Sequence, residues 1–261
     1  MKRRMRRAMI AAFVALAGAS SPNAADFTAD QVRQRLASAT DGKPADFARK
    51  DLSDLDLGHI DFRGADLSGA NLFASRLVSS NLAGARLAGA NLNGAWLMGA
   101  SFAGADLSRS TMLGLVILGG DVKERPNFAG ANLSGVRMIA DLPGADLHGA
   151  NLHGARLGVD MRNQGMGQMR TDLSNANLSG TDLRDADLSR SVMMFADLRG
   201  ADLRGANLFG VKLAGANLTG AQIADADFTE ADLDGTVFTD VQGRDAAKGL
   251  GKAVNAERVV R

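Results

Sequence analysis

The chain has 261 residues, with 31 glycines, no cysteine, no tyrosine and 5% aromatic residues, yet 46% of it is hydrophobic. That aromatic content is low for a conventional enzyme core, and that hydrophobic content is too high for a disordered chain. The lack of cysteine excludes disulfides, thiolate catalysis, cysteine metal sites and a lipoprotein anchor. Residues 1–19 hold five basic residues and no acid, so the remainder has 25 basic and 29 acidic residues, a net charge of −4. This balance does not favour nucleic-acid binding.

The first 25 residues resemble a signal peptide. The segment MKRRMRRAMIAAFVALAGAS starts with basic residues, continues with an apolar stretch from Ala8 to about Ala19, and ends in small residues. Ala17-Gly18-Ala19 fits the A-x-A cleavage rule, so cleavage is expected near 19/20, with positions up to Ala25 also open. The apolar stretch is shorter than the roughly 20 residues of a membrane span, and a basic helix lying on the membrane surface is an alternative. The sequence predicts export to the periplasm or beyond in a bacterium, without a stable membrane span once the signal is removed. Arg6-Arg7 leaves the Sec and twin-arginine routes open.

Residues 26–44 read as a short helix and a linker. Thr28 is a suitable N-cap, Gln31 completes a capping box with it, and Phe27 can pack against Val32. The helix is expected to run to about Ser38 and to end before Gly42 and Pro44. Because repeat arrays need atypical ends, it is expected to cover the first coil of the region that follows.

From Ala45 the sequence repeats every five residues as Ala-(Asp/Asn)-Leu-x-x. Examples of the first three positions are Ala65-Asp66-Leu67, Ala70-Asn71-Leu72, Ala201-Asp202-Leu203 and Ala231-Asp232-Leu233. We call the Leu position the centre; 36 centres lie between Phe47 and Phe238. A period of five fits neither a helix nor a flat strand, so the chain must turn a corner at each unit. Four units would close a square coil, which gives about nine coils and a rod of about 43 Å.

This repeat resembles that of the pentapeptide-repeat family over about Ala45 to Phe238. The resemblance implies an all-β fold, a right-handed quadrilateral β-helix, in which the residues flanking each centre face solvent. Members of the family share a shape more than a function. We therefore expect a β-helix over residues 45–240, and a C-terminal cap over residues 241–261 that leaves the repeat and covers the final coil.

Two interruptions break the repeat, at residues 118–127 and 158–170. The phase shifts by one residue between Ile117 and Phe128, and shifts back between Met138 and Leu142. The segment between Leu157 and Leu173 contains no recognisable centre. Both interruptions are expected to project from the rod as bulges or loops, where function is often located.

Titratable side chains do not form a catalytic pattern. His148 and His153 follow consecutive centres and are predicted to lie on adjacent faces, and His59 stands alone. The many Asp residues occupy outward positions of a convex surface, without the buried cleft that shifts pKa values. We expect no enzyme activity and no cofactor. The one metal candidate is the loop with Met161, Met166 and Met169, because thioethers suit Cu(I); ordinary padding is the alternative.

Mimicry of DNA is the first alternative function, because members that resemble the quinolone-resistance proteins act on type II topoisomerases through an acidic rod. The predicted signal peptide would remove this chain from the cytoplasm. In addition, acids are often followed by arginine, as in Asp182-Leu183-Arg184 and Asp202-Leu203-Arg204. With coils of 20 residues these acids and arginines stack in parallel columns that neutralise each other.

One face is predicted to be apolar. Centres Leu57, Leu77, Leu97 and Ile117 stack, and Met138 and Leu157 are expected to continue the same face. The single tryptophan, Trp96, then points outward near other apolar residues. The predicted interaction surface comprises Phe73, Val78, Trp96, Met98, Leu113, Val116, Leu118 and Ile139. Such a patch on a soluble rod is typical of an interface. The alternative is that segment 119–127 or loop 158–170 covers the patch within the monomer.

The sequence thus predicts an exported, non-catalytic scaffold that acts by protein–protein contact. The expected partner is a protein of unknown identity, and a homodimer is one option. Nucleic acid is not expected as a partner.

Overall fold

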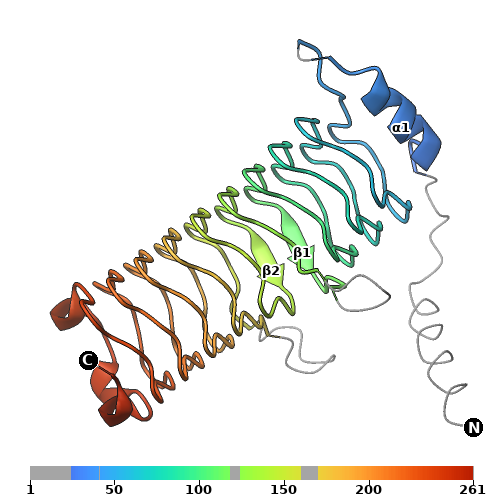
Figure 1. Ribbon diagram of the computed structural model, residues 1–261. Coiled ribbons are helices and arrows are strands. Elements are labelled where there is room, and N and C mark those ends of the chain that lie inside the picture. The colour runs from blue at the N-terminus through green and yellow to red at the C-terminus, as the bar shows by residue number, and fades with distance from the viewer. Residues whose placement is uncertain (1–24, 41, 118–123, 160–169, 261) are drawn as a thin grey trace, which may run out of the picture.

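The chain turns a corner every five residues and winds into a four-sided rod (Figure 1). The structure, a computed structural model, describes residues 25–40, 42–117, 124–159 and 170–260. Along the repeat the centres are buried, as are most of the residues two positions before them, and both belong to one continuous core. The residues on either side of each centre face outward, because a strand points successive side chains to opposite sides.

Parallel backbone pairing between coils defines four faces, which we name by order along the chain. Face 1 pairs Asp46, Asp66, Arg86, Asp106, Asn132, Asn151, Asp182, Asp202, Gln222 and Gln242. Face 2 pairs Asp51, Asn71, Asn91, Thr111, Arg137, Arg156, Asp187, Asn207, Asp227 and Lys248. Face 3 contains two ladders, Asp56 to Val116 through Arg76 and Trp96, and Asp141 to Val254 through Asp172, Val192, Lys212 and Asp232. Face 4 pairs Asp61, Asn81, Ser101, Asn127, Asp146, Asn177, Asp197, Asn217, Val237 and Val260.

The first interruption changes which units stack, and here the sequence-based assignment is wrong. Met138 was expected to follow Ile117 on one face, but Met138 pairs with Met112 on face 2. Arg137 and Ile139 therefore stack on Thr111 and Leu113, and Arg156 continues that face rather than the face of Trp96. The reason is that Phe128 stacks directly on Phe102 of face 4, so the unit of Phe128 takes the face that follows Ile117. Their rings stack at 5.1 Å between centroids, with 9° between planes.

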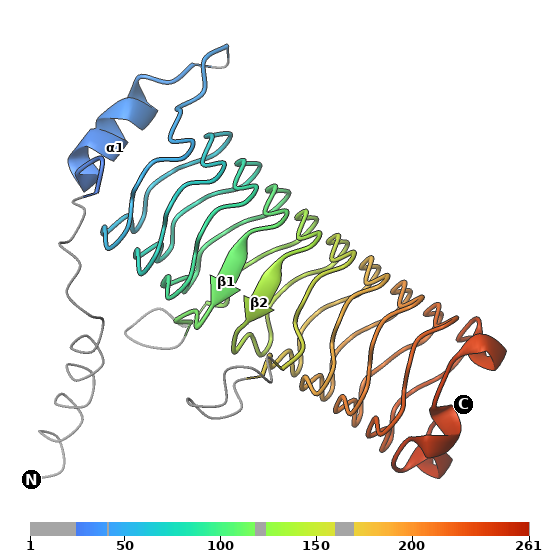
Figure 2. The ribbon, with the colours of Figure 1, turned by 180° about the vertical axis from the view of Figure 1, so that it is seen from behind.

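Among the residues that the structure describes, two stretches are regular strands, β1 (Thr111–Leu113) and β2 (Arg137–Ile139), which are parallel and in register. They lie side by side in the middle of the rod in both views (Figures 1 and 2). The next unit begins at Ala140, one residue early. The unit that contains β2, Val136–Ile139, therefore has four residues instead of five. This shorter unit is the phase shift seen in the sequence between Met138 and Leu142.

Helix α1 (Ala29–Ala37) lies at the N-terminal end of the rod. Thr28 is its N-cap and forms the predicted capping box with Gln31. Val32 is fully buried, and Phe27 packs edge-to-face on Phe47 at 5.6 Å between ring centroids. The helix therefore contributes to the core at the first coil. No helix in the described ranges is both long and apolar enough to cross a membrane.

Residues 241–260, expected to leave the repeat, instead continue the backbone ladder. Gln242, Lys248, Val254 and Val260 pair with the coil before them at six-residue spacing. The extra residue at each corner is accommodated by short 3-10 helices, η3 (Arg244–Ala246), η4 (Leu250–Lys252) and η5 (Ala256–Arg258). The segment is thus a wider final coil (red in Figure 2). Val254 and Val260 are each 51% exposed.

Candidate interaction surface

The large apolar side chains that point outward are concentrated on two adjacent faces. Between residues 45 and 222, the described outward positions of faces 1 and 4 hold no apolar side chain larger than alanine. On face 2 the large apolar residues are Phe73, Leu113, Ile139 and Phe209. On face 3 and its following corner they are Val78, Trp96, Met98, Val116, Val192, Met194 and Phe195. We call faces 2 and 3 together the apolar side of the rod.

Trp96 lies at an outward position of face 3, between Arg76 and Val116 in the ladder. It is half-buried. The Arg76 guanidinium lies 5.1 Å from the centre of the indole ring, and an Arg76 nitrogen is 3.8 Å from a carboxylate oxygen of Asp56. A guanidinium over an indole is a favourable cation–π contact. The indole ring is half-buried, so part of it stays accessible to a partner.

Two predicted surface residues contribute little exposed area. Val78 and Met98 are 8% and 3% exposed. Beside Met98, the Gly99 N–H donates to the Glu124 carbonyl at 2.8 Å. The described end of segment 119–127 therefore pairs with the corner that follows face 3, next to Met98. Leu118, another predicted member, falls outside the described residues.

Face 2 carries an apolar ridge formed by Phe73, Leu113 and Ile139. Leu113 and Ile139 are register partners in β1 and β2, and Phe73 is 48% exposed. Asn93 stands between Phe73 and Leu113, and its Oδ1 accepts a hydrogen bond from the Leu113 N–H at 2.9 Å. Ile139 therefore belongs to this ridge and not to the column of Trp96.

A second apolar patch, not predicted from the sequence, lies further along face 3. Phe195 is 60% exposed, the largest exposure among the large hydrophobic residues of the described chain. Val192 and Met194 precede it on the same side of the coil, and Arg190 stacks on Phe209 at 5.1 Å. The sequence signal for this patch is the run Val192–Phe195, in which Val192, Met194 and Phe195 occupy outward or corner positions.

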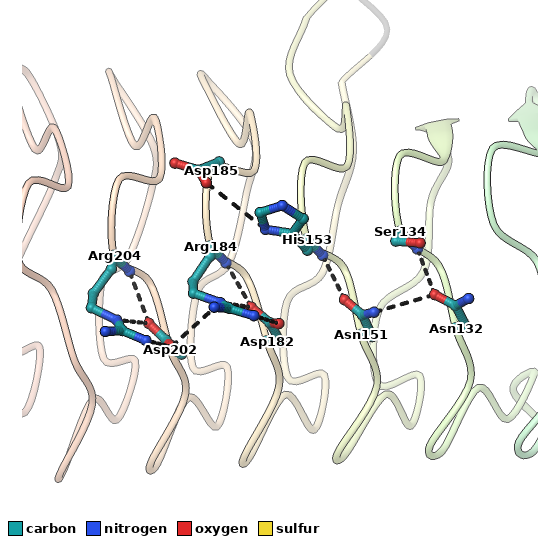
Figure 3. Close-up of polar contacts among 9 residues, drawn as sticks. All are labelled: Asn132, Ser134, Asn151, His153, Asp182, Arg184, Asp185, Asp202 and Arg204. Carbon is teal, nitrogen blue, oxygen red and sulfur yellow. Dashed lines mark hydrogen bonds and ion pairs between the residues drawn. The ribbon is translucent and has the colours of Figure 1, made fainter.

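Faces 1 and 4 are polar, and arginines neutralise several of their aspartates. In one repeated arrangement, an Asp accepts hydrogen bonds from the arginine two residues later. The distance from an arginine nitrogen to a carboxylate oxygen is 2.6 Å in each of the pairs Asp182–Arg184, Asp197–Arg199 and Asp202–Arg204. Figure 3 shows two of these pairs stacked on face 1. In each, the arginine hydrogen bond lowers the pKa of the carboxyl group. The predicted neutralisation of these acidic columns by arginine is confirmed.

Asp66 and Arg86 form the corresponding pair between neighbouring coils, at 2.6 Å. Burial opposes ionisation of Asp66, but hydrogen bonds from Arg86 and Ser68 outweigh it and lower the pKa of the carboxyl group to about 2. Because the pKa of Asp66 is lower in the folded chain than in the unfolded chain, its ionised carboxylate stabilises the fold above about pH 4. This contribution to stability is lost as the pH falls from about 4 toward 2.

We expect Arg86→Ala to raise the pKa of Asp66 toward 3.8 and to reduce the loss of stability between pH 4 and pH 2. Side-chain carbon chemical shifts of Asp66 followed through an acid titration measure the pKa. Arg63→Ala is the matched control, because Arg63 pairs with Asp61 on another face. An unchanged Asp66 pKa in the Arg86 variant would contradict the assigned cause.

His148 and His153 lie on different faces of the rod. His148 lies on face 4, with Nδ1 2.9 Å from Asp146, and His153 lies on face 1, with Nδ1 3.8 Å from Asp185 (Figure 3). Their placement on adjacent faces is confirmed. Within the described ranges, no group of three or more His, Asp or Glu side chains is arranged to hold a metal ion. The copper candidates Met161, Met166 and Met169 fall outside the described residues.

Two cavities lie at the N-terminal end of the rod. A cavity of about 690 Å³ lies between the end of α1 and face 1, and its charged lining residues are Arg35, Lys43, Asp46, Asp66 and Arg86. A second, of about 470 Å³, lies across the linker and includes Asp61 and Arg63. Both are open and polar, and neither adjoins the apolar side.

Comparison with known proteins identifies the repeat. Eight copies match the family described as pentapeptide repeats, over residues 45–77, 75–112, 127–158, 171–208 and 201–240. The matched ranges end near the two interruptions and before the six-residue coil. No curated protein sequence matches the chain.

Several solved structures are similar. HetL, a pentapeptide repeat protein involved in heterocyst differentiation regulation from the cyanobacterium Nostoc sp. strain PCC 7120, is 28% identical over 90% of this chain and 94% of that one, with a TM-score of 0.38. QnrB1, a plasmid-mediated fluoroquinolone resistance protein, is 19% identical over 76% and 91%, with a TM-score of 0.45. A pentapeptide repeat protein of the Arabidopsis thaliana thylakoid lumen is 28% identical over 45% and 69%, with a TM-score of 0.26.

The family match covers more than half of the chain and coincides with the four-sided ladder. This chain therefore belongs to the pentapeptide-repeat family, whose members fold as right-handed quadrilateral β-helices.

Proposed function

We propose that this chain is an exported, non-catalytic β-helical scaffold that acts by protein–protein contact through its apolar side. The observation that carries the proposal is the one-sided distribution of outward apolar residues. Trp96, Phe73 and Phe195 lie on faces 2 and 3, whereas faces 1 and 4 hold neutralised ion pairs. Water-exposed aromatic side chains add little to the stability of a monomer, but they contribute most of the energy of many interfaces.

Export is proposed from the leader-like sequence of residues 1–25. Cell fractionation combined with N-terminal sequencing of the native protein tests it. A periplasmic or secreted chain that begins near Ser20 is the expected result. A cytoplasmic chain that keeps Met1 would contradict export, and a gyrase supercoiling assay would then test the topoisomerase-binding alternative.

The contact surface can be tested by site-specific photo-crosslinking in cells. We expect a photoreactive phenylalanine analogue at Phe73 to give a defined crosslinked product. The same analogue at Ala103, an outward position on face 4, should give none. A product of twice the monomer mass would identify a second copy as the partner. Equal crosslinking from both positions would contradict a one-sided interface.

Trp96→Asp is expected to weaken the captured complex by at least tenfold, because a buried interfacial tryptophan typically contributes about 2 kcal/mol or more. The thermal unfolding midpoint of the variant serves as the control for folding. If the oligomeric state and the partners were unchanged in a folded Trp96→Asp protein, the interface would not include this residue.

Copper binding through Met161, Met166 and Met169 remains the second alternative. Titration of the mature protein with Cu(I), with and without the three methionines, distinguishes it from the proposed function. Saturable binding lost on their removal would favour a metal-handling role.

A further inference from the structure

The apolar ridge of face 2 and the column of Trp96 on face 3 lie on either side of one corner of the rod. Within one coil, Leu113 is the last outward residue of face 2, and Val116 is the first outward residue of face 3. Gly114 lies between them in the sequence and has φ +63°, the left-handed conformation found at the corners. The outward apolar residues of the two faces therefore form the two flanks of a single edge of the rod.

The corner itself carries small residues where its flanks are apolar. Ala74, Gly94 and Gly114 form one column, because each N–H donates to a carbonyl of the next coil, at 2.9, 2.8 and 3.0 Å. The coil after Gly114 adds no side chain to this column, since the unit Val136–Ile139 lacks the fifth residue that forms a corner elsewhere. Along this described stretch of the corner, no side chain larger than that of alanine projects.

Charged side chains occupy the same corner before and after this stretch. Asp54 precedes Ala74 in the column, and its N–H donates to the Phe73 carbonyl at 2.9 Å. Arg190 occupies the corner in a later coil, where its guanidinium lies 5.1 Å from the centre of the Phe209 ring. Phe209 is partly buried, whereas Phe73, beside the small stretch, is 48% exposed. We call the small stretch and its flanks the apolar edge; the flank residues are Phe73, Trp96, Leu113, Val116 and Ile139.

The shape of the apolar edge restricts the surface that can cover it. Phe73 and Ile139 are three coils apart, or about 14 Å at a spacing of about 4.8 Å per coil. A flat surface laid on face 2 or on face 3 covers one flank and leaves the other in water, because the flanks face different directions. A concave groove covers both flanks at once. Aromatic side chains contribute most binding energy when the interface removes them from water completely.

The outward residues next to the edge on face 2 are uncharged over three coils. Asn91 Nδ2 donates to Asn71 Oδ1 at 2.9 Å, and the Thr111 hydroxyl donates to Asn91 at 3.4 Å. On face 3, the Arg76 guanidinium, which lies over the indole ring, is 3.8 Å from an Asp56 carboxylate oxygen. The rim of the edge thus presents amides, a hydroxyl and an ion-paired arginine. A matching groove needs uncharged hydrogen-bonding groups at its own rim.

We propose that the apolar edge inserts into an apolar groove of a different protein, whose rim presents uncharged hydrogen-bonding groups. A second copy of this chain does not fit, because the described rod offers faces and convex corners, and the two cavities at its N-terminal end are polar. This inference rests on the proposed function and specifies the shape and the chemistry of the partner's surface.

The first test compares photo-crosslinking from the two flanks in cells. We expect a photoreactive phenylalanine analogue at Phe73 and the same analogue at Trp96 to capture one and the same protein, identified by mass spectrometry. The captured peptides should come from different segments of that protein, which form the two walls of its groove. The analogue at Ala103 on face 4 is the control and should capture nothing. Capture of two different proteins, or a product of twice the monomer mass, would overturn the proposal.

Gly114→Glu tests whether the partner encloses the corner itself. The backbone tolerates this change, because an added Cβ at Gly114 has nothing within 4 Å and Glu230 occupies the same corner with φ +59°. We expect crosslinking from Phe73 to fall by tenfold or more, since a groove fitted to the edge would have to bury the new charge. Gly104→Glu is the matched control, with φ +63°, nothing within 4 Å and a place at the corner between faces 4 and 1. It should leave crosslinking unchanged.

Circular dichroism and thermal unfolding confirm that both glycine variants are folded. In cell extract, we expect crosslinking to change less than twofold between about 0.05 and about 0.5 M NaCl, because salt screens exposed charge pairs and leaves apolar contact in place. A tenfold loss over this range would show that ion pairs hold the partner, and would contradict the uncharged rim.

The two proposals fail separately. If crosslinking from Phe73 persists in a folded Gly114→Glu protein, or captures a second copy, the interaction surface stands and the groove is wrong. If neither Phe73 nor Trp96 gives a product, the proposed function itself is wrong.

Discussion

Phe102→Ala is expected to cost about 3–5 kcal/mol of unfolding free energy, the typical loss for a buried phenylalanine. Phe102 is fully buried and stacks on Phe128 at 5.1 Å between ring centroids, and the two residues lie on either side of the first interruption in the sequence. Because a solenoid is stabilised mainly by contacts between neighbouring coils, the loss falls on one interface. We expect the coils before and after the first interruption to unfold less cooperatively than in the native chain.

Urea denaturation followed by circular dichroism measures the loss, and hydrogen exchange shows which coils open first. Phe73→Ala is the matched control, since it removes the same ring from a site that is 48% exposed. We expect it to change stability by no more than about 0.5 kcal/mol. Equal losses for the two variants would mean that the stacked pair does not hold the rod together across the interruption.

Gly249→Ala is expected to open the final coil. Gly249 has φ +73°, and a Cβ there would collide with the backbone nitrogen and the hydroxyl of Thr229 in the previous coil. Since the obstacle includes backbone, a rotamer change cannot relieve it. We expect a loss of more than about 2 kcal/mol, beyond the roughly 1–2 kcal/mol that a left-handed conformation costs an ordinary residue.

Gly220→Ala isolates the backbone contribution, because Gly220 has φ +70° and nothing within 4 Å of its added Cβ. Hydrogen exchange at the N–H groups of Lys248, Val254 and Val260, which donate to the previous coil, should accelerate in the Gly249 variant and not in the Gly220 variant. Phe195 and Arg190 adopt positive φ without glycine, so left-handed geometry alone is tolerated at these corners. If both glycine variants behaved alike, steric collision would not be the cause.

Residue pairing after an interruption could not be predicted from the sequence, whereas pairing within an uninterrupted run could. The stack of Arg76, Trp96 and Val116 follows from 20-residue coils and is observed. The step from Val116 to Arg137 assumed that the inserted residues occupy a side of the rod. In the structure Phe128 is on face 4, the face that follows Ile117 on face 3, so Arg137 lies on face 2 and not on face 3. The candidate site changes with it, because Ile139 joins Phe73 and Leu113 on face 2.

The exposure of some candidate site residues also depends on contacts that the repeat pattern does not predict. Met98 points outward by pattern but is 3% exposed, beside the corner where Glu124 contacts Gly99. The terminal coil gives a similar case, because Gly243, Gly249 and Asn255 start turns of six-residue sides that a search for period five treats as non-repeat.

By itself, the sequence determined the five-residue side, the buried centres and alanines, the capped helix before them, and the neutralisation of acid by arginine within a unit. These are local properties, set by residues a few positions apart and by strict repetition. The tertiary structure decided which units stack across the interruptions, how the chain ends, and which outward residues stay exposed. Those outcomes depend on pairing between segments 19 to 31 residues apart, where packing such as Phe128 on Phe102 selects one register among several that the pattern allows.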